Sequence, residues 1–122
     1  MFDSLNVILY VADVAASAAF YGTLIGKPPV EASPNFAMFI LASGDTLGLW
    51  ANQDVQPAPN PGGGSELIFT AKDKAEVDSR HREWKQRGWA IAQSPVQMDF
   101  GYTFTALDPD KHRLRVFFPA RP

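Results

Sequence analysis

The sequence predicts an α+β fold built from two copies of one βαβββ module. The first observation behind this prediction is that a strand, a helix and three further strands follow in the same order in each half of the chain. The second is the repeat interval: Asp13 and Asp73, which each precede a helical pattern, lie 60 residues apart, and Gly26 and Gly88, which follow those patterns, lie 62 apart. A chain of 122 residues fits one domain. We therefore expect a single domain over 1–122, with module one at 1–51, a linker at 52–65 and module two at 66–122.

The first module opens with a strand at residues 5–11, which are rich in β-branched and aromatic side chains. Asp13 is expected to cap the following helix, because its carboxylate can accept from the exposed N–H groups of the first turn. Gly26 and the two prolines that follow it end this helix. Further strands are expected at residues 30–32, 36–41 and 46–50, with Ser43-Gly44-Asp45 as the hairpin turn between the last two.

The linker contains three prolines and three consecutive glycines, so no strand or helix is expected between residues 52 and 65. The second module then repeats the order of the first. A strand at 67–71 leads to Asp73 as the cap, and a helix at 74–87 carries Val77, His81 and Trp84 on one face. Three more strands are expected at 90–93, 102–107 and 113–118, with Asp108-Pro109-Asp110 as the last turn.

Alternation along the strands predicts that each sheet has a helix-covered face and a second face of mixed character. The second face carries large rings, including Tyr10, Trp50 and Phe117, beside isolated charged groups such as Glu66 and Arg115. Apolar walls with a few polar groups are typical of a ligand-binding cup, whereas the alternative is a plain solvated sheet face. We therefore expect a curved mixed-sheet cup with the helices outside. The residues expected to line it are Tyr10, Phe39, Trp50, Glu66, Phe100, Tyr102, Phe104 and Arg115.

Composition narrows the partners and the compartment. The net charge is −2, which disfavours nucleic acid because that partner requires a basic surface. No apolar stretch approaches the roughly 20 residues needed to span a membrane, and the N-terminus does not resemble a signal peptide. Cysteine is absent, so disulfides and thiol chemistry are excluded. These features favour a cytoplasmic protein that binds neither membrane nor nucleic acid.

Six of the eleven basic residues fall between positions 72 and 87, where four acidic residues are interleaved with them. Acid-first pairs such as Glu76–Arg80 have the i,i+4 spacing that stabilises a helix. A docking surface for an acidic partner and a solvated helix face are both compatible with this pattern, and the interleaving favours the solvated face.

Several motifs then point to a known family. Val11-Ala12-Asp13, followed by Ser17 and Phe20-Tyr21, and Asp108-Pro109-Asp110 near the end resemble the vicinal-oxygen-chelate superfamily. That superfamily includes glyoxalase I, extradiol dioxygenases, and fosfomycin and bleomycin resistance proteins. The resemblance runs from about residue 5 to residue 118. The stretches 100–103 and 112–116 are most similar to the phenazine- and drug-binding branch.

The resemblance also implies where catalytic relatives hold a divalent metal. The four corresponding positions here are Asn6, Gly48, Glu66 and Arg115. An amide, a glycine and a guanidinium are poor or impossible metal ligands beside a single carboxylate, so we expect no metal and no other cofactor. If the correspondence holds, Glu66 and Arg115 point at the same centre. They would then form either a bidentate ion pair with donors to spare for a ligand, or an exposed pair of little energetic consequence.

Four functions remain open on the sequence. The first is a binding protein for a small, planar aromatic compound, of the antibiotic-sequestering or resistance kind, with no catalytic residue. The second is a metal-free lyase or isomerase with Glu66 as general base; no side chain is predicted to be a dedicated partner acid, although Tyr102 could serve as one. The third is a metal-dependent lyase or dioxygenase. The fourth is a pure interaction module, whose cup would be filled by its own side chains.

Two further expectations come from the resemblance. Related proteins complete or cover each cup across a two-fold interface, which implies a homodimer. Relatives usually have glycine after the Asp-Pro-Asp turn, where this chain has Lys111. If that position requires a positive φ angle, lysine costs about 1 kcal/mol there.

Overall fold

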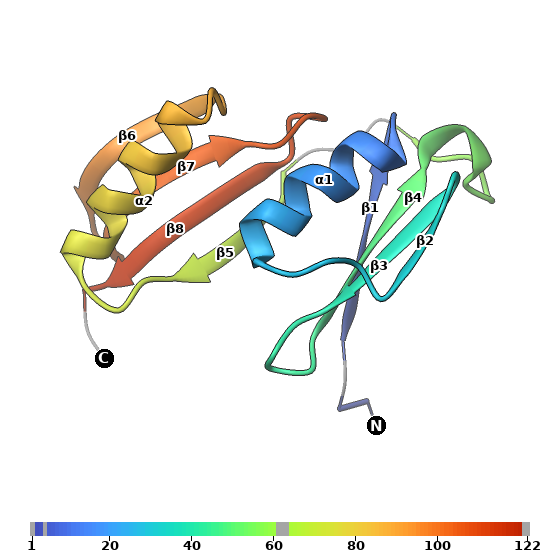
Figure 1. Cartoon of the computed structure of the whole chain (residues 1–122). Helices are drawn as coiled ribbons and strands as arrows, with labels where there is room; N and C mark the ends of the chain where they lie inside the picture. Colours follow the sequence, from blue (N-terminus) through green and yellow to red (C-terminus); the bar gives the residue numbers. More distant parts are fainter. Residues whose placement is uncertain (1, 4, 61–63, 121–122) are drawn as a thin grey trace. The chain divides into compact units, whose positions relative to one another are not determined.

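The computed structural model describes residues 2–3, 5–60 and 64–120, and the chain divides into two compact units, Met1–Gly62 and Gly63–Pro122. Within the described residues, each unit consists of one α-helix and one four-stranded mixed sheet (Figure 1). The order of elements is βαβββ in both units, so the predicted α+β fold with two modules is confirmed.

Unit 1 contains strands β1 (Asn6–Val11), β2 (Glu31–Ser33), β3 (Phe36–Ile40) and β4 (Thr46–Ala51), and helix α1 (Val14–Ile25). The strand order is β1-β4-β3-β2, with β1 parallel to β4 and the other pairs antiparallel. The caps follow the prediction: Asp13 accepts from the N–H of Ala16 at 3.1 Å, and Gly26 ends the helix in the left-handed region.

Helix α1 covers one face of the unit 1 sheet. Val14, Ser17 and Tyr21 are its buried residues, and Gly22 lies directly above the ring of Phe39. On the sheet the buried row includes Leu47 and Leu49 of β4. Since neighbouring strands present register partners on the same face, Ala37 and Phe39 of β3 join this row through their pairing with Leu49 and Leu47.

Unit 2 contains strands β5 (Glu66–Thr70), β6 (Ile91–Met98), β7 (Gly101–Leu107) and β8 (Arg113–Pro119), and helix α2 (Lys74–Gln86). The strand order is β5-β8-β7-β6, with β5 parallel to β8. Asp73 caps α2 by accepting from the N–H of Glu76 at 2.7 Å, and the Glu76 carboxylate in turn accepts from the N–H of Lys72 at 2.8 Å. This reciprocal arrangement satisfies two of the exposed donors at the helix start.

The core of unit 2 lies between α2 and its sheet. Val77 and Trp84 are buried on the helix, as the spacing predicted. The ring of Phe104 on β7 is fully buried and makes edge contacts with His81 and Trp84, at centroid distances of 5.4 and 5.3 Å. The opposite face of this sheet carries no helix of its own unit.

Two local expectations need correction. Asn52–Asp54 forms a 3-10 turn, η1, and Val55 after it is buried, so the start of the expected linker is ordered by an apolar anchor. Strand β6 continues to Met98 rather than ending at Gln93. It passes through Pro95 because β6 is an edge strand, where a residue without an N–H is tolerated. The pairing with β7 shifts register between Ile91 and Gln93 and again between Gln93 and Val96. The remainder of the expected linker includes residues 61–63, which lie outside the described residues.

The turn before β8 confirms the expectation about Lys111. Asp108 accepts from the N–H groups of Asp110 and His112, both at 2.8 Å, which closes the turn. Lys111 between them has φ 68°, in the left-handed region that glycine adopts at little cost. Lysine is therefore strained at this position.

Candidate functional site

The helix-free face of the unit 1 sheet is predominantly apolar and partly exposed. Tyr10 and Trp50 are register partners on β1 and β4, and their rings meet edge to face with centroids 6.3 Å apart. Phe36 of β3 pairs with Trp50 on the other side. Tyr10 is 44% exposed, so part of this ring surface is available to another molecule. The strand register thus places Tyr10 and Trp50 on one face of the sheet, as expected.

The helix-free face of the unit 2 sheet has a charged centre. Arg115 on β8 donates from Nε to Glu66 Oε1 on β5 at 2.7 Å. Its Nη1 donates to Gln93 Oε1 on β6 at 3.2 Å and to Thr103 Oγ1 on β7 at 3.3 Å. The side chains of Arg115 and Glu66 are 13% and 26% exposed. Partners from the three other strands of the sheet therefore hold one half-buried guanidinium, and its contact with Glu66 passes through Nε rather than through the expected bidentate fork.

An aromatic ring covers this guanidinium. Phe100, in the turn between β6 and β7, lies with its ring centroid 5.4 Å from Cζ of Arg115, within the range of a cation–π contact. The same ring is 6.1 Å from that of Phe117 on β8. The turn is fixed by the N–H of Ala120, which donates to the Phe100 carbonyl at 2.9 Å. Phe100 is nonetheless 45% exposed, so it presents its outer surface to solvent.

Three rings of the predicted cup face the helices instead. Phe39 and Phe104 have no exposed surface and pack in the cores of units 1 and 2. Tyr102 lies two residues from Phe104 on β7 and so shares its face, where its hydroxyl donates to Asp78 Oδ1 of α2 at 2.6 Å. Because side chains alternate along a strand, none of the three rings can point to the helix-free face.

The location of Tyr102 weakens the enzyme alternative. The hydrogen bond to the Asp78 carboxylate raises the pKa of the Tyr102 hydroxyl above its ordinary value, with desolvation as a smaller cause. A tyrosine whose proton is held by a carboxylate on one face of the sheet cannot serve Glu66 on the other face. Tyr102 therefore cannot act as the partner acid of Glu66.

The positions that the resemblance assigns to a metal do not fit one. The side-chain amide oxygen of Asn6, Oδ1, accepts from the Thr46 hydroxyl. The space above Gly48 is filled by Ile8 and the ring of Phe36, which lie 3.2 Å from where a side-chain carbon would begin. Arg115 occupies the fourth position with a permanent positive charge, bonded to the one carboxylate of the set. Among residues 2–3, 5–60 and 64–120, no three His, Cys, Asp or Glu side chains are grouped so that they could hold a metal ion.

Sequence reasoning missed the residues that organise the Arg115 centre. Gln93 and Thr103 each contact the guanidinium, but both looked like ordinary strand residues. Phe117 was noted as a ring on the mixed face without being assigned to the site. Pairing Thr103 with Phe117 and Thr105 with Arg115 would have revealed the set, because register partners lie on one face.

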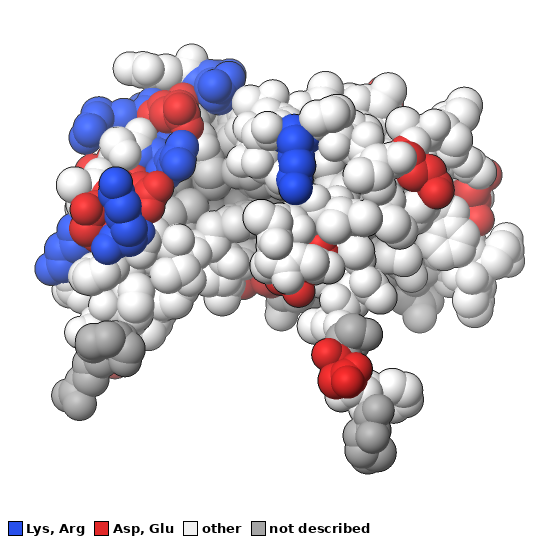
Figure 2. All heavy atoms as spheres, turned by 60° about the horizontal axis from the view of Figure 1, so that its bottom comes forward, with Lys and Arg blue, Asp and Glu red and all other residues white. Residues whose placement is uncertain are grey.

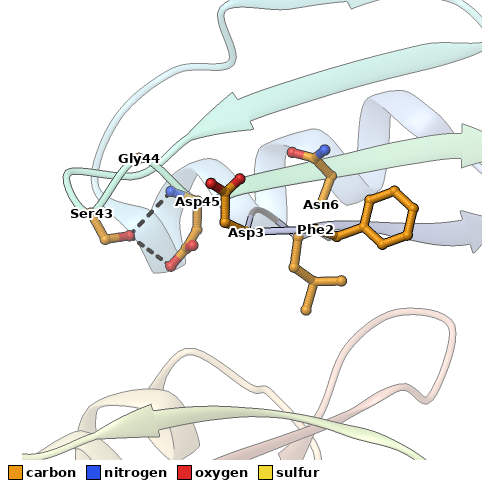
Figure 3. A pocket seen from close by; sticks show the side chains of 7 residues that line it. Phe2, Asp3, Asn6, Ser43, Gly44 and Asp45 are labelled. Carbon is orange, nitrogen blue, oxygen red and sulfur yellow. Dashed lines mark hydrogen bonds between the residues drawn. The ribbon is translucent and has the colours of Figure 1, made fainter.

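A separate hollow of about 550 Å³ lies at the start of β1 and beside the β3–β4 turn (Figure 3). Its lining is largely polar, and Figure 3 shows Asp3, Asn6 and Asp45 at its edge, with the Ser43 hydroxyl turned onto Asp45. None of the predicted ligand residues lines it. Phe2 and Leu5 are its apolar lining residues, and the other five are polar residues or glycine.

The surface of α2 carries both charges, and Figure 2 shows basic and acidic side chains intermixed there. Arg80 forms ion pairs with Glu76 at 3.2 Å and with Glu83 at 3.5 Å. The predicted Glu76–Arg80 pair is thus confirmed, and the helix face resembles a solvated surface more than a docking site for an acidic partner.

Comparison with known proteins decides the family. The profile of the Glyoxalase/Bleomycin resistance protein/Dioxygenase superfamily matches residues 4–116. The chain belongs to this superfamily. The resemblance drawn from the Asp13 and Asp108 motifs is therefore confirmed.

Individual proteins are similar to this chain over nearly its whole length. The phenazine antibiotic resistance protein EhpR of Enterobacter agglomerans is 34% identical over 113 residues, covering 89% of this chain and 86% of that protein. A protein of Agrobacterium tumefaciens with a solution NMR structure is 49% identical, with a TM-score of 0.90 and coverage of 98% of this chain and 99% of that one. A glyoxalase-related enzyme of Fulvimarina pelagi shares the fold at 23% identity, with a TM-score of 0.83 and coverage of 96% and 88%.

No helix in the described part of the chain combines the length and the apolar character needed to cross a lipid bilayer.

Proposed function

We propose that the protein binds a small, planar aromatic compound on a helix-free sheet face, without a metal, as a sequestering or resistance protein. The observation that carries this proposal is the Arg115 centre. A positively charged, multiply bonded guanidinium occupies the position where catalytic relatives are expected to hold a metal. Similarity to a phenazine antibiotic resistance protein supports binding as the function.

The rings on the helix-free faces support an aromatic ligand. Tyr10 and Trp50 form an edge-to-face pair on the unit 1 sheet, and Phe100 and Phe117 form a tilted pair on the unit 2 sheet. Aromatic contacts of this kind add about 0.5–1.5 kcal/mol each beyond the area that they bury. At a binding free energy of about −0.3 kcal/mol per heavy atom, an aromatic ligand of roughly 20 heavy atoms would bind with a Kd of tens of micromolar.

Tryptophan fluorescence tests the proposal. Phenazine and other planar aromatics are titrated into the wild-type protein and into Trp50→Phe. We expect a saturable change in the wild type that is largely lost in Trp50→Phe. Trp89→Phe is the matched control, since Trp89 contacts Trp84 beside α2 and should leave the Trp50 response unchanged.

A flat response of the wild type across a chemically varied panel would contradict the proposal. Native mass spectrometry of protein isolated from cell extract adds a direct reading of retained ligand and bound metal. A stoichiometric transition metal in that spectrum would instead favour a metal-dependent enzyme of the same superfamily.

We further propose that the protein works as a homodimer in the cytoplasm. Exposed apolar side chains on the edge strand β6, Val96 at 40% and Met98 at 39%, and Val30 at 62% beside β2, offer surface for association. Light scattering coupled to size-exclusion chromatography measures the mass directly. A monomer at micromolar concentrations would contradict this part.

A further inference from the structure

The guanidinium of Arg115 has donors left over after its protein contacts. Nε donates to Glu66, and Nη1 donates to Gln93 and Thr103. Nη2 has no hydrogen-bond partner among the described residues. The described part of the chain has no fully buried side-chain nitrogen or oxygen without a partner, so Nη2 retains some surface open to solvent. The N–H groups of Nη2 are thus available to a ligand, on a guanidinium that its other contacts hold in place.

The side chains of Thr103 and Gln93 offer no second hydrogen-bond donor at this centre. The Thr103 hydroxyl donates its proton to the Val116 carbonyl at 2.8 Å, so it can only accept from a new partner. The Gln93 amide donates to Met98 Sδ at 3.8 Å, while its oxygen accepts from Arg115 and from Thr105. A ligand oxygen arriving at this centre therefore finds its hydrogen-bond donor on Arg115.

Apolar surface lies next to the same donor. Phe100 lies over the guanidinium at 5.4 Å, Phe117 lies 6.1 Å from Phe100, and Ile68 is the register partner of Arg115 on β5 and is 53% exposed. All of these groups belong to unit 2. A planar ring carrying one acidic substituent matches this arrangement, with the ring against the phenylalanines and the acid on Nη2.

We propose that the ligand is an aromatic carboxylate whose acid group binds Nη2 of Arg115. This inference rests on the proposed function and names its ligand class. A carboxylate gains the Coulomb attraction of the guanidinium in addition to the hydrogen bond, whereas a carboxamide offers only a neutral acceptor. The Nε–H and one Nη2–H share an edge of the guanidinium, so the Glu66 carboxylate bonded to Nε lies beside Nη2 and opposes an incoming anion. The acid of the ligand is therefore placed at the other Nη2–H, on the Nη1 side. We expect a preference for the carboxylate over the matched amide of about tenfold.

Three probes test the charge preference: phenazine, phenazine-1-carboxylate and phenazine-1-carboxamide, titrated calorimetrically at pH 7.5. The carboxylate should bind the wild type about tenfold more tightly than the carboxamide. In Arg115→Met that difference should disappear. Arg113→Met is the matched control, because it removes the same charge from the same strand and should retain the preference.

Glu66→Gln gives an independent readout that does not require loss of Arg115. The glutamine oxygen can still accept from Nε, whereas the opposing negative charge is gone. The carboxylate should therefore bind Glu66→Gln several-fold more tightly than wild type, while the carboxamide changes little. This variant also keeps the test valid if Arg115→Met does not fold.

The outcomes separate the two proposals. If phenazine binds but the carboxylate and carboxamide bind equally, the inference about the acid fails and the aromatic-binding function stands. If the preference persists in Arg115→Met or disappears in Arg113→Met, Arg115 is not the anchor. If none of the probes binds, both proposals fail.

Discussion

Glu66 and Arg115, which lie 49 residues apart in the sequence, are joined by a 2.7 Å hydrogen-bonded ion pair across the parallel strands β5 and β8. Both side chains are largely shielded from solvent, so screening reduces this interaction less than it would reduce that of a surface pair. The guanidinium keeps Gln93 and Thr103 as partners if the carboxylate is removed. These features lead to a prediction about stability.

Glu66→Ala should lower the free energy of unfolding by about 1–2 kcal/mol, between the values typical of exposed and fully buried pairs. Glu66→Gln, which retains an acceptor for Nε, should lose less. Urea denaturation of the wild type, Glu66→Ala, Arg115→Met and the variant that carries both substitutions makes up a double-mutant cycle. A coupling energy near zero would show that the pair adds nothing to stability.

Gly101 is predicted to tolerate no side chain. A Cβ at this position would lie 2.2 Å from the carbonyl oxygen of Phe118, and the φ angle of 153° is one that other residues rarely adopt. Gly101→Ala should therefore destabilise the fold by more than about 2 kcal/mol and displace Phe100 from Arg115.

Gly44→Ala is the control for this prediction. Gly44 also has a positive φ angle, of 92°, but nothing lies within 4 Å of the position where its Cβ would be. Its substitution should cost only about 1 kcal/mol. Equal losses in the two variants, measured by thermal or urea unfolding, would contradict the steric argument.

Replacing Lys111 should stabilise the protein. Lysine at φ 68° is in the left-handed backbone conformation, which is unfavourable for residues with a side chain. Glycine avoids this cost but loses more chain entropy on folding. We expect Lys111→Gly to raise the free energy of unfolding by up to about 1 kcal/mol. Lys27→Gly, at an exposed site without positive φ, should give no gain. A lower melting temperature for Lys111→Gly would oppose this expectation.

The Tyr102–Asp78 hydrogen bond predicts a pH dependence at the alkaline end. Since the carboxylate raises the pKa of Tyr102 in the folded state, the associated stability is fully present below the ordinary tyrosine pKa of 10.0. It is lost as the pH rises from there through the raised value. Tyr102→Phe should cost about 1 kcal/mol at pH 7 and lose less stability than wild type above pH 10. Urea midpoints measured from pH 7 to 11 test both parts, and parallel curves would argue against it.

The element pattern of the chain was predictable because it depends on local signals. Asp13, Gly26 and Asp73 cap or end helices where the sequence indicated. The strand predicted at 90–93 in fact runs on to Met98 through Pro95, which is tolerated because β6 lies at an edge. Edge position is a property of the sheet and not of the strand's own residues.

The ring assignments show where local reasoning stops. On β7, the alternating apolar row of Tyr102, Phe104 and Ala106 was a signal for the helix-covered face, and it was available in the sequence. On β3, both rows are apolar, since Phe36, Met38 and Ile40 alternate with Ala37 and Phe39. Only the pairing of Phe39 with Leu47 decides that Phe39 is core and Phe36 is not.

The sequence by itself determined the two-module α+β fold, the caps and turns, and the family, because these depend on spacings of a few residues or on a repeat. It also indicated that Glu66 and Arg115 could meet. Only the tertiary structure decided how the guanidinium is held, which rings stay exposed and which donor is left over. The physical reason is that those properties depend on strand register, which brings residues together from four strands that no local pattern relates.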